Sequence, residues 1–250
     1  MAEKHATLSA SGAHRWMECT KSIGLEDHFE KEETSVFAEE GTLAHAVAEA
    51  MLRDQLQTDS KIKWPKFDNV MREYVRMYVD YCRDLHTQAV LAGKDFTALI
   101  EERVNFDQWV PEGFGTNDFM LITAEKLIVI DLKYGKGIKV EALKNSQLRL
   151  YALGGIQEYG WIYPFQTIEM HIVQPRLNHI SVEVMSRKGL EQWAEDTLVK
   201  KANQAMTGEG EYTPGDHCRW CTARATCSAR AYSMLDIIQN IIKGEKDKNV

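Results

Sequence analysis

The chain has 250 residues, with 37 Asp and Glu against 30 Lys and Arg, which gives a formal net charge of −7. This length buries a core without disulfide bonds, and a content of 44% hydrophobic and 27% charged residues excludes a disordered or fibrous protein. No apolar run reaches the roughly 20 residues of a membrane helix, and the first residues lack the apolar stretch of a secretory signal. We therefore expect a cytoplasmic protein with no membrane partner, in which nucleic-acid binding would need a local basic groove.

Hydrophobic spacing predicts two helices, then three strands, a helix, two strands and two final helices. The expected helices cover residues 39–54, 71–91, 142–159, 187–206 and 228–242. The expected strands cover residues 98–106, 114–123, 126–133, 166–174 and 179–185. This order predicts an α/β fold with one mixed sheet between helices.

We expect the 250 residues to form one domain. Its core would cover about 95–185, between an N-terminal helical part (1–94) and a C-terminal part (186–242). The charged tail, 243–250, is expected to be flexible.

Two consecutive predicted strands each carry an aspartate, and the two aspartates would come close together if the strands pair. Asp118 lies in the second strand, and Asp131 and Lys133 lie at the end of the third. The alternation of side chains places Asp131 and Lys133 on the same face. Two adjacent carboxylates repel each other unless a cation lies between them, and hard ions such as Mg²⁺ or Mn²⁺ prefer oxygen ligands. The pattern indicates a metal site, although D-x-K alone is more often a solvated strand end.

Three cysteines near the C-terminus form a C-x2-C-x5-C pattern, Cys218, Cys221 and Cys227. Thiolates at this spacing converge on one metal ion or iron–sulfur cluster. The candidates for a fourth ligand are Cys19, Cys82 and, less favoured, His217.

A basic segment follows Lys133. From this residue to Arg149 the chain carries five basic residues against one acid, Glu141. The segment is either a solvated loop or a rim that contacts phosphates, and we favour the second interpretation. Besides Lys133, the residues expected to contact phosphates are Lys136, Lys139, Lys144 and Arg149.

Taken in order, these motifs resemble the PD-(D/E)XK nuclease superfamily, in its RecB-like branch with an iron–sulfur cluster. The residues that carry the resemblance are Gly41 to His45, Gly115 to Asp118, Asp131 to Lys133, Gln147 with Tyr151, and the four cysteines Cys19, Cys218, Cys221 and Cys227. AddB-type nuclease domains, RecB-type CRISPR-associated exonucleases and phage or prophage relatives share this pattern. Each motif is weak alone, whereas their joint order is specific. Asp131 stands where many relatives have Glu.

The resemblance implies a restriction-endonuclease-like fold and a role for each residue. His45, Asp118, Asp131 and the Leu132 carbonyl would bind Mg²⁺ or Mn²⁺, and Lys133 would be the catalytic lysine. Either Glu101 or Glu102 would face the site, with Glu102 a possible further ligand. Gln147 and Tyr151 would lie near Lys133 and the DNA backbone.

The four cysteines would hold a structural [4Fe–4S] cluster that joins the two ends of the chain, with Zn²⁺ as the alternative. Cys82 would be a buried free thiol.

The expected function is a metal-dependent DNA exonuclease that acts on linear single- or double-stranded DNA. It would work in phage-type or bacterial recombination, with a recombinase or single-strand-annealing protein as a conceivable partner. Two alternatives remain open. One is a structure-specific endonuclease or nickase, and the other is an inactive nucleic-acid-binding accessory protein. Polarity, strand preference and oligomeric state do not follow from the sequence.

Overall fold

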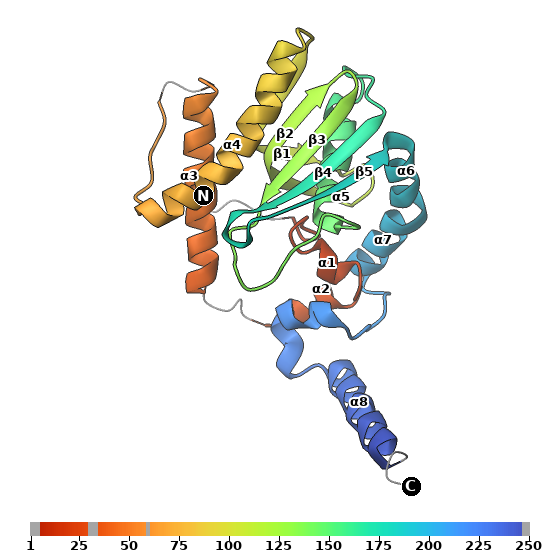
Figure 1. Cartoon of the computed structure of the whole chain (residues 1–250). Coiled ribbons are helices and arrows are strands. Elements are labelled where there is room, and N and C mark those ends of the chain that lie inside the picture. Colours follow the sequence, from red (N-terminus) through yellow and green to blue (C-terminus); the bar gives the residue numbers. More distant parts are fainter. Residues whose placement is uncertain (1–5, 30–34, 59–60, 247–250) are drawn as a thin grey trace.

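A five-stranded mixed sheet forms the centre of the computed structural model, which describes residues 6–29, 35–58 and 61–246 (Figure 1). Its strands are β1 (Phe96–Asn105), β2 (Phe114–Thr123), β3 (Lys126–Leu132), β4 (Thr167–Gln174) and β5 (His179–Ser186). They lie in sequence order, and every pair is antiparallel except β3 and β4. The predicted mixed α/β fold is therefore confirmed.

Helices cover both faces of the sheet. The parallel pair β3–β4 needs a crossover, and α5 (Ser146–Tyr159) supplies it on one face. The helices α3 (Val36–Gln55) and α4 (Asn69–Leu91) cover the other face (Figure 1). Each helix begins at a polar cap, since the side chains of Ser35, Asp68 and Asn145 accept a backbone N–H of the first turn.

The two ends of the chain meet beside the α5 face. The short helices α1 (Ala13–Trp16) and α2 (Ser22–Glu26) contact α7 (Val199–Thr207). They also contact the 3₁₀ turns Asp216–Trp220 and Thr222–Ala225. The helix α6 (Arg187–Trp193) leads into α7 through a π-helical turn, Ala194–Leu198, so the single helix expected over 187–206 is interrupted.

The apolar residues form one cluster on each face of the sheet. On the α5 face, Leu8 and Trp16 from the N-terminal segment are buried with Leu198 and Ala202 from the C-terminal one. On the other face, α3 and α4 pack against β2 and β3. The core is thus closed by residues from both ends of the chain.

The last helix, α8 (Ser228–Lys246), extends away from the rest of the molecule (Figure 1). It exposes a row of large apolar side chains: Met234, Leu235, Ile237, Ile238, Ile241 and Ile242. Residues 243–246 of the tail that was expected to be flexible continue α8, and 247–250 lie outside the described residues. Across the described ranges, no helix combines the length and apolarity needed to cross a membrane.

Candidate functional site

The strands β2 and β3 bring three of the predicted residues to one end of the sheet. Asp118 is buried on β2, and its Oδ2 accepts the backbone N–H of Leu132 on β3 at 2.6 Å. At the end of β3, Lys133 Nζ lies 2.8 Å from Oδ2 of the buried Asp131. This ion pair confirms that Asp131 and Lys133 share a face.

The regular alternation of side chains breaks at the centre of β1, next to this site. Ile100 packs in the cluster under α3 and α4, whereas Val104, four residues on, packs in the cluster under α5. An undistorted strand would keep both on one face. Between them, Glu101 has a φ of 47°, a left-handed conformation that is uncommon for a residue other than glycine. Such local strain is found at functional sites.

The same break occurs on the partner strand. Phe119 packs under α3 and α4, while a Cβ at Gly115 would lie 2.9 Å from the Tyr151 ring of α5. The register Ile100 to Phe119 and Glu102 to Asn117 places Glu101 opposite Asp118. Strict alternation therefore fails on both strands at the position where the two carboxylates lie.

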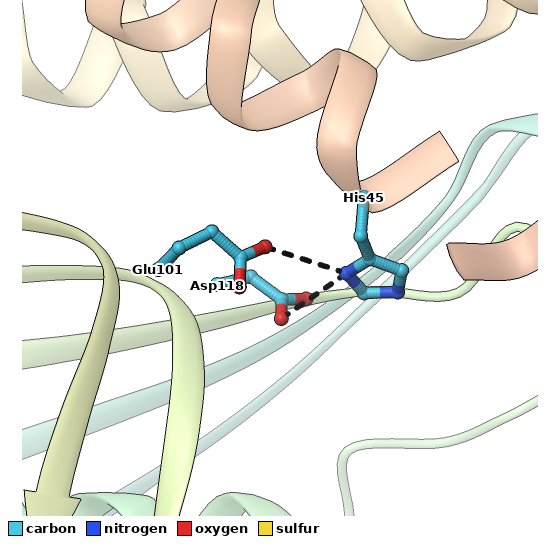
Figure 2. Close-up of side chains that lie close together, drawn as sticks. All are labelled: His45, Glu101 and Asp118. Atoms are coloured by element: carbon cyan, nitrogen blue, oxygen red, sulfur yellow. Dashed lines mark ion pairs between the residues drawn. The ribbon is translucent and has the colours of Figure 1, made fainter. Parts of the chain in front are cut away.

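His45 of α3 completes a group of three possible metal ligands (Figure 2). Its Nδ1 lies 3.3 Å from Asp118 Oδ1 and 3.6 Å from Glu101 Oε1. One ligand atom from each residue lies within 4.8 Å of the others. The apolar side of α3 packs on the sheet through Ala44, Val47 and Ala48, and His45 on this helix reaches Asp118 and Glu101 in the middle of β2 and β1. An imidazole with two carboxylates is a donor set suited to Mn²⁺ or Mg²⁺.

The structure selects Glu101 rather than Glu102. Glu102 lies in the β1–β2 ladder opposite Asn117 and is exposed. The possible ligand role of Glu102 is corrected, because the turn in the backbone at Glu101 directs that side chain to His45 instead. The sequence left the choice between the two glutamates open, and the contact of Glu101 with His45 decides it.

Asp131 and Leu132 lie at the edge of the ligand group. Asp131 is outside the 4.8 Å set and is paired with Lys133. The N–H of Leu132 points at Asp118. In an extended strand the carbonyl of a residue points toward the same neighbouring strand as its N–H, so the Leu132 carbonyl lies on the β2 side.

The electrostatics of the site reflect its crowded carboxylates. Burial lowers the pKa of His45, but the carboxylates of Asp118 and Glu101 outweigh burial and raise this pKa to about 11. Burial raises the pKa of Asp131, and Lys133 opposes the rise. Burial lowers the pKa of Lys133, but Asp131 more than compensates, so the net shift is upward. Both bases are therefore cationic beside the acids, and a bound cation would release the proton from His45.

Gln147 and Tyr151 of α5 continue the network. Lys133 Nζ donates to Gln147 Oε1 at 2.8 Å, and Gln147 Nε2 donates to Tyr151 Oη at 3.2 Å. The predicted shared helix face is confirmed. Gln147 thus holds Lys133 from the side opposite Asp131.

The basic segment after β3 is divided between exposed and buried cations. Lys136, Lys139 and Lys144 are exposed. Arg149 differs from its expected role in binding DNA, because it is buried, forms a 2.6 Å ion pair with Glu183 and lies over the Trp193 ring. Its charge is neutralised inside the protein.

Gln174, at the end of β4, organises this segment and was not identified from the sequence. The side chain is buried, its Nε2 donates to the carbonyls of Gly135 and Ile138 at 2.8 Å, and its Oε1 accepts the N–H of Val140 at 3.1 Å. These three bonds fix the loop that carries Lys136 and Lys139. No motif marked this residue, because one glutamine before a proline is common.

The four predicted cluster ligands line one small cavity, Cys19 from the N-terminal segment with Cys218, Cys221 and Cys227. Cys82 is fully buried on α4, in the other core cluster, as expected. Burial raises the pKa of Cys19 and of Cys221, so these thiols need a bound metal to become thiolates. No three of the sulfurs come within 4.8 Å of one another across the described chain.

Polar contacts tie the walls of this cavity together. Arg15 donates to the Trp220 carbonyl at 3.1 Å and pairs with Glu26 at 2.9 Å, and Glu26 accepts the N–H of Thr222 at 2.9 Å. Three arginines, Arg15, Arg224 and Arg230, line the cavity beside the cysteines. A metal ion or cluster with four thiolate ligands has a net negative charge, which these arginines would balance.

Comparison with known proteins gives a family without an assigned activity. Residues 5–247 match the family described as "Protein of unknown function (DUF2800)", and the chain belongs to that family. The solved structure titled "Crystal structure of SSO0001" is 15% identical over 84% of this chain and 95% of that chain, with a TM-score of 0.30. A score this low supports no argument about fold or function, so the site is interpreted from its own residues.

Proposed function

We propose that the protein is a metal-dependent nuclease that hydrolyses phosphodiester bonds in DNA, acting as an exonuclease. The observation that supports this proposal is the meeting of His45, Glu101 and Asp118 around one point, beside the paired Asp131 and Lys133. Charged groups of both signs are held there at the end of a sheet, next to an exposed basic segment. This combination fits a negatively charged substrate that is cut with the help of a metal ion.

The donor set fits a divalent cation. His45, Glu101 and Asp118 would hold the ion, with Asp131 and the Leu132 carbonyl as the further ligands that the resemblance implies. When bound, a divalent ion lowers the pKa of water and neutralises charge on the phosphate.

The protein's own residues position the reacting groups. Lys133 Nζ, fixed between Asp131 and Gln147, orients the attacking water and donates to a phosphate oxygen. Tyr151 holds Gln147 in place. Pre-oriented donors of this kind stabilise the charge that develops in the transition state without reorganising during the reaction.

The cysteine cavity belongs to the same proposal, as the site of a structural [4Fe–4S] cluster. Tetrahedral zinc with bonds of about 2.3 Å requires thiolate sulfurs about 3.8 Å apart. The sulfurs of Cys19, Cys218, Cys221 and Cys227 surround one cavity without three of them coming within 4.8 Å. This wider spacing favours the larger group over zinc.

The test compares DNA substrates and variants. Protein purified without oxygen is incubated with Mn²⁺ and either end-labelled linear DNA or closed circular DNA. The wild type should shorten linear DNA only, and Lys133→Ala should be inactive although it folds and binds DNA. Lys94→Ala is the matched control, since Lys94 is exposed and pairs with Glu125 away from the site.

The outcomes separate the alternatives. Cutting of the circles would replace the exonuclease by an endonuclease at the same residues. An active Lys133→Ala enzyme would refute the assigned site. A folded wild type that cuts neither DNA would refute the nuclease and leave a binding protein.

A further inference from the structure

A large groove opens beside the catalytic lysine. Its volume is about 830 Å³, and Lys133 and Gln147 form part of its lining. On the other side it is bordered by Arg219 and Trp220, which belong to the turn that carries Cys218. The proposed metal site and the cysteine segment are therefore connected along one surface.

The groove is basic although the protein is acidic. Five Lys and Arg side chains line it, against two acidic ones. Lys133 and Arg149 are paired with Asp131 and Glu183, so the charge offered to a ligand comes from Lys144, Lys201 and Arg219.

The start of a helix faces the groove. The first turn of α5 reaches the groove through Ser146 and Gln147, and a helix N-terminus attracts phosphate.

Two tryptophans lie among these cations. Trp193 is half-buried under Arg149, whereas Trp220 is 56% exposed. Alternating cations and aromatic rings are typical of surfaces that bind single-stranded nucleic acid, because bases stack on the rings while cations follow the phosphates. Pockets of about 300–1,000 Å³ hold molecules of drug size, and the groove, at about 830 Å³, is of the size that takes a short stretch of single strand.

We propose that this groove binds a single strand of DNA and leads it past Lys133, with a base stacked on Trp220 and phosphates on Lys201 and Arg219. The proposal rests on the proposed function for the identity of the ligand, and it assigns that function a single-stranded substrate. It also gives the cysteine segment a second role, since the turn beside Cys218 forms one wall of the groove.

The experiment measures binding rather than cleavage. A short fluorescent oligothymidylate and a blunt duplex of equal length are titrated with the full chain in Ca²⁺. Trp220→Ala should weaken binding of the single strand roughly 5- to 150-fold, and Trp220→Phe should restore most of the affinity. Arg219→Gln should reduce the salt slope by about 0.7. Trp161→Ala, at an exposed tryptophan outside the groove, should change nothing.

A second measurement covers the case in which Trp220→Ala disturbs the cysteine segment. Ultraviolet cross-linking of a halogenated pyrimidine strand to the wild type should label Trp220. Unchanged affinity in Trp220→Ala, equal losses for strand and duplex, no labelled Trp220, or tighter binding of an oligouridylate would each overturn the proposal. Binding that behaves as expected in a chain that cuts no DNA would refute the nuclease while the groove assignment stands.

Discussion

The two candidate sites of this molecule are built in opposite ways. His45, Glu101 and Asp118 come from a 20-residue helix, the edge strand β1 and its neighbour β2, and the backbone of Leu132 fixes Asp118 directly. The cysteine cavity is formed by short helices, 3₁₀ turns and a loop from the two ends of the chain. The residues of the first site lie on regular elements of the sheet and its covering helix, whereas those of the second lie on short segments that the proposed group would join.

The difference lies in what holds each site together. Around the cysteines, the ties include the Arg15–Glu26 pair, whose side chains are 19% and 13% exposed, and hydrogen bonds to the Trp220 carbonyl and from the Thr222 N–H. Each contact of this kind has a net contribution of about 1 kcal/mol. Under the proposed function, a bound metal would add to the local stability there, whereas the strands set the geometry of the sheet site.

The largest expected effect is on activity at the sheet site. Asp118→Asn keeps an acceptor for the Leu132 N–H but removes the charge that would hold a cation. We expect the cleavage rate to fall at least about 1,000-fold, with a melting temperature near that of the wild type. Gel assays measure the cleavage rate and thermal melting measures the melting temperature. The control is Asp84→Asn, at an exposed carboxylate of α4. A variant that keeps a tenth of the activity would contradict the assignment.

The next effect is on stability at the cysteine cavity. Cys221→Ser should lose the absorption of the bound group and lower the free energy of unfolding by about 3–5 kcal/mol, because metal binding contributes to folding. Iron and sulfur analysis, absorbance and denaturant titration test this. Cys82→Ala should keep the full absorption, since Cys82 is buried in the other cluster. If Cys82→Ala loses it instead, the ligand set is wrong.

The adjacent residues Glu101 and Glu102 test whether the sheet site binds a metal through one particular glutamate. Glu101→Gln should weaken Mn²⁺ binding about 10- to 100-fold, the usual cost of disturbing a metal's surroundings, and Glu102→Gln should leave it unchanged. Calorimetric titration of both variants with Mn²⁺ gives the affinities. Equal losses would mean that the turn at Glu101 does not select between them.

The smallest expected effect is a loss of folding stability at low pH, through the buried His171. Burial lowers the pKa of His171 to about 4, beside Tyr81 and Glu169. An unfolded histidine takes up its proton near pH 6.5, so the unfolded chain binds more protons between these values and stability falls as pH decreases. From pH 7 to 5 the loss should be about 2 kcal/mol, and His171→Gln should reduce it. Denaturant titrations at both pH values check this; an equally steep loss in the variant would contradict it.

The sequence predicted the sheet and the grouping of Asp118, Asp131 and Lys133 better than the exact geometry of the site. The strands β2 and β3 and the Asp131–Lys133 pair follow from alternation, which is a local rule. The choice between Glu101 and Glu102 stayed open, because alternation does not reveal the left-handed backbone of Glu101 or its contact with His45, which lies far away in sequence. Arg149 was misplaced because nothing local reveals Glu183, its partner on another strand.

The burial of Leu8 and Trp16 among residues of α7 and the preceding turn has a consequence for how the protein is made. The ribosome makes these two side chains long before their partners near residue 200. At about 5–20 residues per second, Leu8 and Trp16 wait roughly 10 to 40 s for this part of the surface that covers them. Cys19 likewise cannot meet the other three cysteines until residues 218–227 have been made.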